Sequence, residues 1–152
     1  MGTAADQTAS SLNGRGGYHG SIHPNSKTTL YYSVNVFSEV LPNGWENSIA
    51  VFDQPWKNVV ATLFHEMNEF RTDPDVQDTI EASSDAEALQ FLGWTSRQGQ
   101  EIGDFPIMAA GNNLQLVFQQ VRAFKRSLFL PIQFQYSNAA HGPEGQIKKP
   151  HQ

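Results

Sequence analysis

The chain has 152 residues, of which 39% are hydrophobic and 16% charged, and its formal net charge is −5. A chain of this length folds as one domain that buries roughly two-thirds of its unfolded surface. The negative charge gives no electrostatic reason to expect a nucleic-acid or membrane partner, and no apolar run approaches the roughly 20 residues that span a bilayer. With no cysteine, disulfides and thiolate sites are excluded, so any metal must be held by His, Asp and Glu.

The N-terminal residues 1–17 are small and polar, and we expect a flexible arm there. The first ten have neither a basic nor an apolar region, so we expect no signal peptide. The protein is then cytoplasmic or is exported as part of a longer precursor. His19 and His23 follow, and we expect two surface imidazoles in a loop, with a place in a site as the alternative.

Two strands are predicted before the first helix. Residues 28–38 are dense in β-branched and aromatic side chains that alternate along the chain, with Leu30, Tyr32 and Val34 on one face. This alternation is typical of a half-buried strand. The short apolar run 49–52 predicts a second strand that leads into the helix.

The longest predicted helix lies within residues 55–75. Pro55 suits its first turn, Asp53 offers a capping carboxylate, and the residue before Pro74 ends it. The helical spacing of its apolar side chains predicts that they face the core; these are Val59, Val60, Leu63, Phe64, Met67 and Phe70.

Beyond this helix, residues 85–92 predict a second helix with Ser84 as N-cap and Gly93 as its stop. Residues 114–121 and 128–136 predict two strands of a hairpin, with Pro131 at an edge or a bulge. The order predicts an α+β domain, at 18–145, in which the long helix packs on a small, mainly antiparallel or mixed sheet. Residues 146–152 predict an irregular tail.

The long helix also carries a candidate metal site. His65 and Glu69 are four residues apart and project from one side of it, with Glu66 about 100° around. This is the spacing of a zinc hydrolase helix, except that the second ligand is Glu where the usual pattern has His. Glu66 would then be the general base beside the metal-bound water.

A catalytic zinc site needs a third protein ligand. Glu101 is the first choice, since thermolysin-like enzymes take theirs from a glutamate well downstream, and Asp104 would then accept a hydrogen bond from the His65 ring. The reverse assignment, with Asp104 as ligand, is nearly as good. Asp75 ranks third: it stands where astacin-like enzymes place a ligand, but Thr72 replaces the glycine that those enzymes need.

Two carboxylate ligands would cancel the formal charge of a divalent ion. The ion is then a weaker Lewis acid than in a site with two His and one Glu, so that Mn²⁺ or Ca²⁺ competes better with Zn²⁺. Tyr136 and His141 close the last strand and could stabilise a developing oxyanion. The plainer alternative is an amphipathic helix with solvated Glu66 and Glu69, a tyrosine at a strand end and a loop histidine.

Five short motifs occur in a fixed order: His65-Glu66-x-x-Glu69, Thr72-Asp73-Pro74, Gly93-Trp94, Glu101-Ile102-Gly103-Asp104 and Tyr136-Ser137-Asn138. Together they resemble a bacterial group of zincin-like proteins, over about residues 16–145. The chain is also distantly similar to the plant phosphate-induced (EXORDIUM-like) family, including Gly17-Tyr18-His19 ahead of a strand. The resemblance implies a zincin-like fold and a metal-dependent hydrolase, with peptides as the expected substrate class. The chain departs from the group after Asp104, where Phe105 and Pro106 stand in place of a frequent cysteine.

Two functions are therefore carried forward. The first is a zinc peptidase-like hydrolase in which His65, Glu69 and Glu101 or Asp104 hold the metal and a peptide or another small molecule is the substrate. The second is a non-catalytic zincin-like binding domain, whose aromatic residues Tyr31, Trp45 and Trp94 would stack on a carbohydrate or a peptide.

Overall fold

The computed structural model of the protein describes residues 10–40, 42, 44, 46–94, 100–111, 113–122, 129–137 and 142–143, with the backbone alone at 12, 136–137 and 142–143. The predicted α+β class is confirmed. The sheet is divided into three separate antiparallel strand pairs, β1–β2, β3–β4 and β5–β6. In chain order the elements are η2 (Ser11–Asn13), β1 (Gly17–Asn25), β2 (Thr28–Asn35), α1 (Pro55–Thr72), α2 (Val76–Glu81), α3 (Asp85–Phe91), α4 (Asp104–Ala110), η3 (Leu114–Leu116), β3 (Phe118–Arg122), β4 (Phe129–Gln133), β5 (Tyr136–Ser137) and β6 (Gly142–Pro143).

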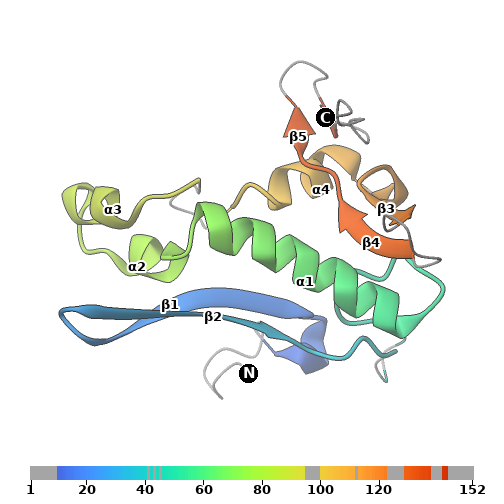
Figure 1. Ribbon diagram of the computed structural model, residues 1–152, viewed down its shortest axis with the longest axis horizontal. Helices are drawn as coiled ribbons and strands as arrows, with labels where there is room; N and C mark the ends of the chain where they lie inside the picture. The colour runs from blue at the N-terminus through green and yellow to red at the C-terminus, as the bar shows by residue number, and fades with distance from the viewer. Residues whose placement is uncertain are drawn as a thin grey trace.

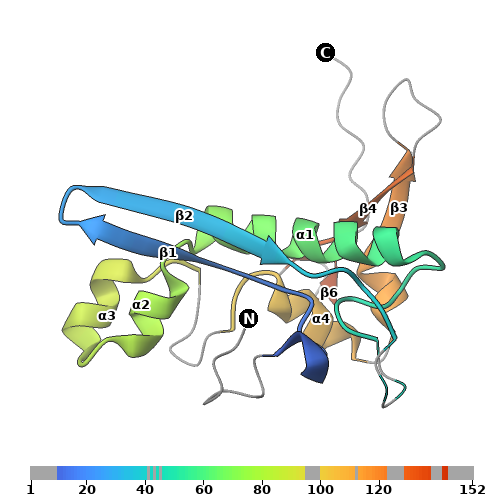
Figure 2. The same cartoon turned by 90° about the horizontal axis from the view of Figure 1, so that it is seen from below.

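Helix α1 is the central element. The β1–β2 hairpin runs along one side of it, while α4 and the β3–β4 pair lie on the other (Figure 1). Helices α2 and α3 pack together beyond the C-terminal end of α1, near the tip of the hairpin (Figures 1 and 2). Side chains that point from α1 toward either side are therefore enclosed by segments far apart in the sequence.

The β1–β2 hairpin differs from the prediction in two ways. His19 does not lie in a surface loop: it is part of β1, pairs with Ser33 across the hairpin and is 7% exposed. The side chains expected inside, Leu30, Tyr32 and Val34, are instead 50%, 38% and 38% exposed. The opposite face meets α1, where the rings of Tyr31 and Phe70 pack edge to face with centroids 5.7 Å apart.

The prediction for the buried face of α1 is confirmed only in part: Val59, Val60, Phe64 and Phe70 are partly buried. Leu63 and Met67, expected in the core, are 38% and 50% exposed. The helix instead turns a mainly polar face inward, and its buried residues are Asn58, Ala61, Thr62, His65, Glu66 and Glu69. Hydrophobic periodicity misleads here because this helix packs its polar side against a site as well as against a core.

The N-terminal half of α1 carries the hydrophobic core. Ala61, Val117 and Phe118 are buried together, with Ile49, Val51, Phe52, Ile107, Ala110 and Leu114 packed around them. Residues 49–52 are not a strand, as had been predicted. Their backbone is held by α1 side chains instead: Asn58 Oδ1 accepts hydrogen bonds from the Val51 and Phe52 amides, and Thr62 Oγ1 accepts one from the Ile49 amide.

The ends of α1 were predicted in part. Its N-cap is Gln54 rather than Asp53, whose carboxylate pairs with Lys57 at 2.6 Å. Its C-terminal end meets the Gly93-Trp94 segment, where the Trp94 amide donates to the Thr72 carbonyl at 3.1 Å. Gly93 fits this contact because a Cβ there would lie 2.4 Å from the same carbonyl oxygen. Two motifs that are separate in the sequence therefore meet in the fold.

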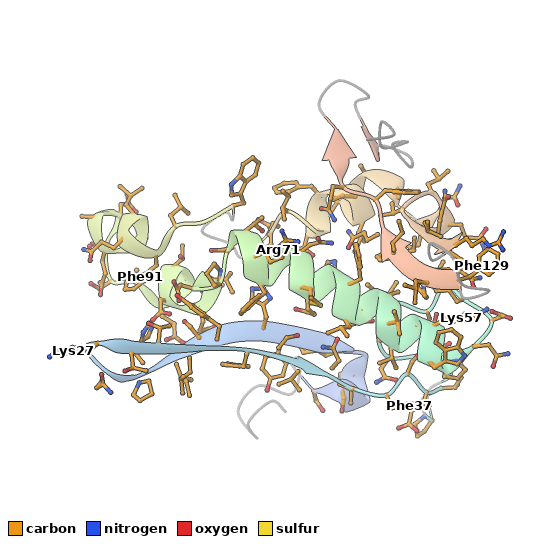
Figure 3. All side chains as sticks on the ribbon, in the orientation of Figure 1. Lys27, Phe37, Lys57, Arg71, Phe91 and Phe129 are labelled. Atoms are coloured by element: carbon orange, nitrogen blue, oxygen red, sulfur yellow. The ribbon has the colours of Figure 1, made fainter. Side chains whose placement is uncertain are left out.

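The remaining predictions concern α3 and the C-terminal hairpin. Helix α3 and its N-cap are confirmed, with Ser84 Oγ accepting from the Glu87 amide. The β3–β4 hairpin is confirmed with shorter strands, and Pro131 lies in β4 opposite Gln120. Figure 3 shows Lys27 and Phe91 at one end of the molecule and Lys57 and Phe129 at the other. None of the helices in the described ranges combines the length and apolarity that a membrane span requires.

Candidate metal centre

A pocket of about 610 Å³ opens beside the C-terminal half of α1. Its lining includes acids and histidines from α1, from β1 and from the start of α4 with the loop before it. These six residues are His65, Glu66, Glu69, His19, Glu101 and Asp104. The four acids that the sequence predicted as ligands or base thus meet in one place, and a second histidine joins them.

His65 faces acceptors on both sides of its ring. Nδ1 lies 2.9 Å from Gln133 Oε1, while Nε2 lies 3.3 Å from Glu69 Oε1 and 3.7 Å from Asp104 Oδ1. The first assignment gave Asp104 the role of accepting a hydrogen bond from the His65 ring, but Gln133 occupies that position at Nδ1, and Asp104 lies near Nε2 instead. Since ionised carboxylates only accept, this approach requires a proton on Nε2 or on one of the acids, or a cation between them.

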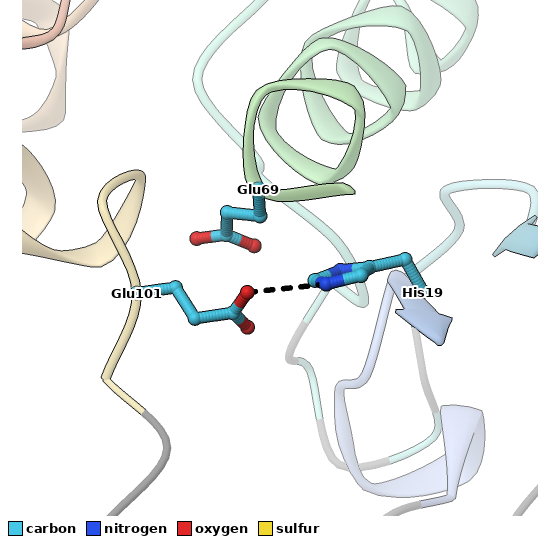
Figure 4. A group of neighbouring side chains, drawn as sticks. All are labelled: His19, Glu69 and Glu101. Atoms are coloured by element: carbon cyan, nitrogen blue, oxygen red, sulfur yellow. Dashed lines mark ion pairs between the residues drawn. The ribbon is translucent and has the colours of Figure 1, made fainter. Parts of the chain in front are cut away.

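His19 joins three site elements. Its Nδ1 lies 3.1 Å from Glu66 Oε2, and its Nε2 lies 3.0 Å from the Asp73 carbonyl oxygen and 3.1 Å from Glu101 Oε1 (Figure 4). Burial lowers the pKa of His19, but the contacts with Glu101 and Glu66 outweigh it and raise the pKa to about 10. Because a carbonyl can only accept, Nε2 carries a proton, and His19 is an imidazolium that links Glu66 to Glu101.

Glu69 is buried in the pocket without a hydrogen bond at Oε1 to stabilise its ionised form. It is 3% exposed, and its Oε1 makes no hydrogen bond although it is buried. Burial raises the pKa of Glu69 to about 10, and the nearby Glu101, Asp104 and Glu66 carboxylates add to the shift. Burial likewise raises the pKa of Glu101, partly offset by His19. Figure 4 shows Glu69 directed toward the side chains of Glu101 and His19.

Within this pocket, two sets of three described side chains have ligand atoms within 4.8 Å of one another: His19, Glu69 and Glu101 form one, and His65, Glu66 and Glu69 the other. Glu69 belongs to both. His19 is the weaker ligand because its Nε2 proton is bound to the Asp73 carbonyl. Neither set joins His65 and Glu69 to Glu101 or Asp104: the set that contains Glu101 has His19, and the set that contains His65 has Glu66.

The backbone around the site is shaped for close approach. A Cβ on Gly103 would lie 2.5 Å from Glu69 Oε1 and 2.8 Å from His65 Nδ1. A Cβ on Gly17 would lie 3.0 Å from Glu66 Oε1. Glycine at both places lets the loop before α4 and the start of β1 close over the acids.

The structure places the other predicted residues elsewhere. Asp75 groups with His23 and Asp78, near the hairpin tip, rather than with His65 and Glu69. Tyr136 begins β5, whose description is limited to the backbone, and His141 lies outside the described residues, as does Trp45. Their predicted roles as oxyanion groups or as a stacking surface stay predictions.

One contact of the site, Gln133, was missed, and His19 was considered only as the alternative to a surface imidazole. The only local signal for His19 was its place in Gly17-Tyr18-His19 ahead of a strand, and Gln133 had none. Each gains its role from a partner far along the chain: 47 residues separate His19 from Glu66, and 68 separate Gln133 from His65.

No protein-family model, no curated protein and no solved structure matches the chain.

Proposed function

We propose that this protein binds a divalent cation at the α1 pocket and uses it in hydrolysis, with a peptide as the first substrate class to test. The observation that carries the proposal is the buried Glu69 Oε1, which has no hydrogen bond while three further carboxylates surround it. One imidazolium, His19, offsets only part of the charge that these four acids carry when ionised. A divalent cation between Glu69 and His65 would accept electron pairs from both Glu69 Oε1 and His65 Nε2.

The donor set suits such an ion. His65 would supply a nitrogen, Glu69 an oxygen, and Glu101 or Asp104 a second oxygen. These are ligands that Zn²⁺ accepts, and the excess of carboxylate favours Mn²⁺ or Ca²⁺ more than a site with two histidines would. When bound, the cation supplies Lewis acidity that polarises a substrate carbonyl and acidifies a water molecule.

Glu66 is the proposed general base. One of its oxygens, Oε2, is held by His19 Nδ1 at 3.1 Å, which fixes the carboxylate at the pocket wall. Its other oxygen would accept the proton of the attacking water and pass it to the leaving group. His19 thus acts as a positioning residue for the base, while its contact with Glu101 draws the downstream segment toward the same pocket.

Metal analysis and calorimetry with Zn²⁺, Mn²⁺ and Ca²⁺ test the binding step on the full chain. Glu69→Gln should fold, because it removes a buried acid that lacks a hydrogen bond, yet it should lose cation binding. The control is Glu39→Gln, which changes an exposed acid outside the pocket. A stoichiometric site that is absent, or that persists unchanged in Glu69→Gln, would overturn the proposal.

The catalytic step has its own test. Glu66→Gln should keep the cation but lose about 10²- to 10⁴-fold in the hydrolysis of a peptide library, the usual contribution of a general base. If turnover survives in Glu66→Gln, the base is another group.

A non-catalytic binding domain is the second candidate function. The observation in its favour is Trp94, an aromatic side chain that is 69% exposed beside the end of α1. Ligand binding that persists in a His65→Ala/Glu66→Ala double variant, with no turnover in the wild type, would support this function over the first.

A further inference from the structure

Gln133 is a buried amide in β4 that no motif of the sequence singles out. It is 3% exposed, and β4 packs against α1 on the side opposite the β1–β2 hairpin. Its Nε2 donates to the Gly103 carbonyl oxygen at 2.5 Å, and its Oε1 lies 2.9 Å from His65 Nδ1. The side chain therefore connects the metal-site helix to the segment that carries Glu101 and Asp104.

These two contacts determine the orientation of the amide. A carbonyl oxygen can only accept, so the Gln133 atom facing Gly103 must be the NH₂ group. The oxygen of Gln133 then faces His65 Nδ1, and this oxygen can only accept as well. Nδ1 must therefore carry the proton, and in the neutral ring the lone pair is on Nε2.

The lone pair that results points at the candidate metal centre. His65 Nε2 is the ring nitrogen that faces Glu69 Oε1 at 3.3 Å and Asp104 Oδ1 at 3.7 Å. The opposite tautomer would place a hydrogen on Nε2 and leave no lone pair on the side of the acids. It would also bring the unprotonated Nδ1 against Gln133 Oε1, with two acceptors facing each other.

We propose that Gln133 is a positioning residue that holds His65 in the Nδ1–H tautomer and so presents Nε2 to a divalent cation. The metal half of this inference rests on the proposed function; the tautomer itself is a property of the metal-free protein. Histidine ligands usually donate their second N–H to a carboxylate, a backbone carbonyl or water. A neutral amide does the same here without adding a fifth negative charge to the four acids of the pocket.

The experiment reads the tautomer directly. Long-range ¹H–¹⁵N NMR of the metal-free full chain, at a pH where the ring is neutral, distinguishes a protonated ring nitrogen from an unprotonated one. The His65 signals are assigned by their loss in His65→Ala. We expect wild-type His65 to have a protonated Nδ1 and an unprotonated Nε2.

Two variants and one control follow. Gln133→Met removes both hydrogen bonds at similar volume, and we expect mixed tautomers together with a zinc affinity that falls about 10- to 100-fold by calorimetry. Gln133→Glu keeps an oxygen facing Nδ1 and loses only the donor to the Gly103 carbonyl, so it should keep the wild-type tautomer. This variant tests the tautomer even where Gln133→Met is poorly folded. Gln119→Met makes the same change at an exposed position of β3, the neighbouring strand, and should alter neither readout.

The outcomes separate the two proposals. An Nε2–H tautomer in the wild type, or an unchanged tautomer and zinc affinity in a folded Gln133→Met, overturns the role of Gln133 and leaves the metal centre standing. The expected tautomer in a wild type that binds no Zn²⁺, Mn²⁺ or Ca²⁺ overturns the proposed function, and with it the role of Gln133 in presenting a ligand.

Discussion

Single glycines decide how closely the segments of the site approach one another. At Gly103 the space that a side chain would need is already taken by Glu69 Oε1 and His65 Nδ1. Its φ of −73° is open to any residue, so the requirement for glycine is steric and not conformational.

Gly103→Ala should therefore damage the site without straining the backbone. The added methyl group has to displace Glu69 or His65, and we expect a loss of about 1–3 kcal/mol in stability, the usual cost of overpacking, together with weaker cation binding. Chemical denaturation and calorimetry measure the two effects.

Gly20→Ala is the matched control for this prediction. Its Cβ would meet the Tyr32 hydroxyl at 3.1 Å, the free end of a partly exposed side chain that can move aside. Equal losses in the two variants would show that the close contacts of Gly103 with Glu69 and His65 have no special importance for stability or cation binding.

At the residue scale, the sequence predicts the part of the site that lies within one helix or one short motif. His65, Glu66 and Glu69 are recognisable because their spacing repeats the helical period, and Glu101 and Asp104 because they flank a glycine. His19 and Gln133 are brought in by the packing of β1 and β4 on α1. A lone histidine in a strand and a lone glutamine have no spacing from which such contacts could be inferred.

At the scale of elements, α1 has two functions on one buried face. Its first half packs on Val117 and Phe118, and its second half presents the acids and the histidine of the pocket. The helix itself was predictable, since the proline signals at its two ends, Pro55 and Pro74, are local. Its inward face was not, because the periodicity rule takes the apolar side as the buried one.

The corrected face of α1 has a measurable consequence. Met67→Ala should cost no more than about 0.5 kcal/mol, as for an ordinary surface change, because the side chain is half exposed. Ala61→Leu, at a position with 0% exposure, should cost about 1–3 kcal/mol through overpacking. Urea denaturation of both variants checks the order, and the reverse order would restore the apolar stripe as the core face.

Asn58 holds the segment 49–52, which was predicted to be a strand, by hydrogen bonds between its side chain and the backbone. It is 1% exposed, and its side chain accepts from the Val51 and Phe52 amides and donates to Glu46 Oε1 at 2.8 Å. Asn58→Ala leaves these groups without their partner, and we expect a loss of about 2–4 kcal/mol, from one or two unsatisfied buried groups.

The control for Asn58 is Asn68, which lies in the C-terminal half of α1. Asn68→Ala removes an amide whose Nδ2 makes no hydrogen bond, so its effect on the urea midpoint should be small. Similar midpoints for the two variants would contradict the role of Asn58 as the anchor of residues 49–52.

For the whole molecule, the raised pKa values of Glu69 and His19 predict how the free energy of unfolding depends on pH. The folded protein keeps Glu69 protonated up to a pKa of about 10, whereas the unfolded chain loses that proton near 4.5. His19 stays protonated up to about 10 when folded and to about 6.5 when unfolded. Since the folded state binds more protons through this window, stability falls as pH rises.

The melting temperature of the metal-free protein should accordingly drop between about pH 5 and pH 9. A saturating divalent cation should flatten the curve, because it stabilises the ionised form of Glu69, and Glu69→Gln should reduce the slope without any metal. Differential scanning calorimetry over this range tests the sign. A melting temperature that rises with pH would contradict the protonation of both groups.

The convergence of β1, α1, the segment before α4, and β4 on one pocket has a consequence for the folding of the chain. A cation bound there would fasten together positions as far apart as Glu69 and Glu101, with His19 and Gln133 tied to the same cluster through Glu66 and His65. Such a clip closes long loops, where cross-links restrict the unfolded chain most. Binding and folding should then be thermodynamically linked, so that cation addition slows amide hydrogen exchange in both β1 and β4, on opposite sides of α1.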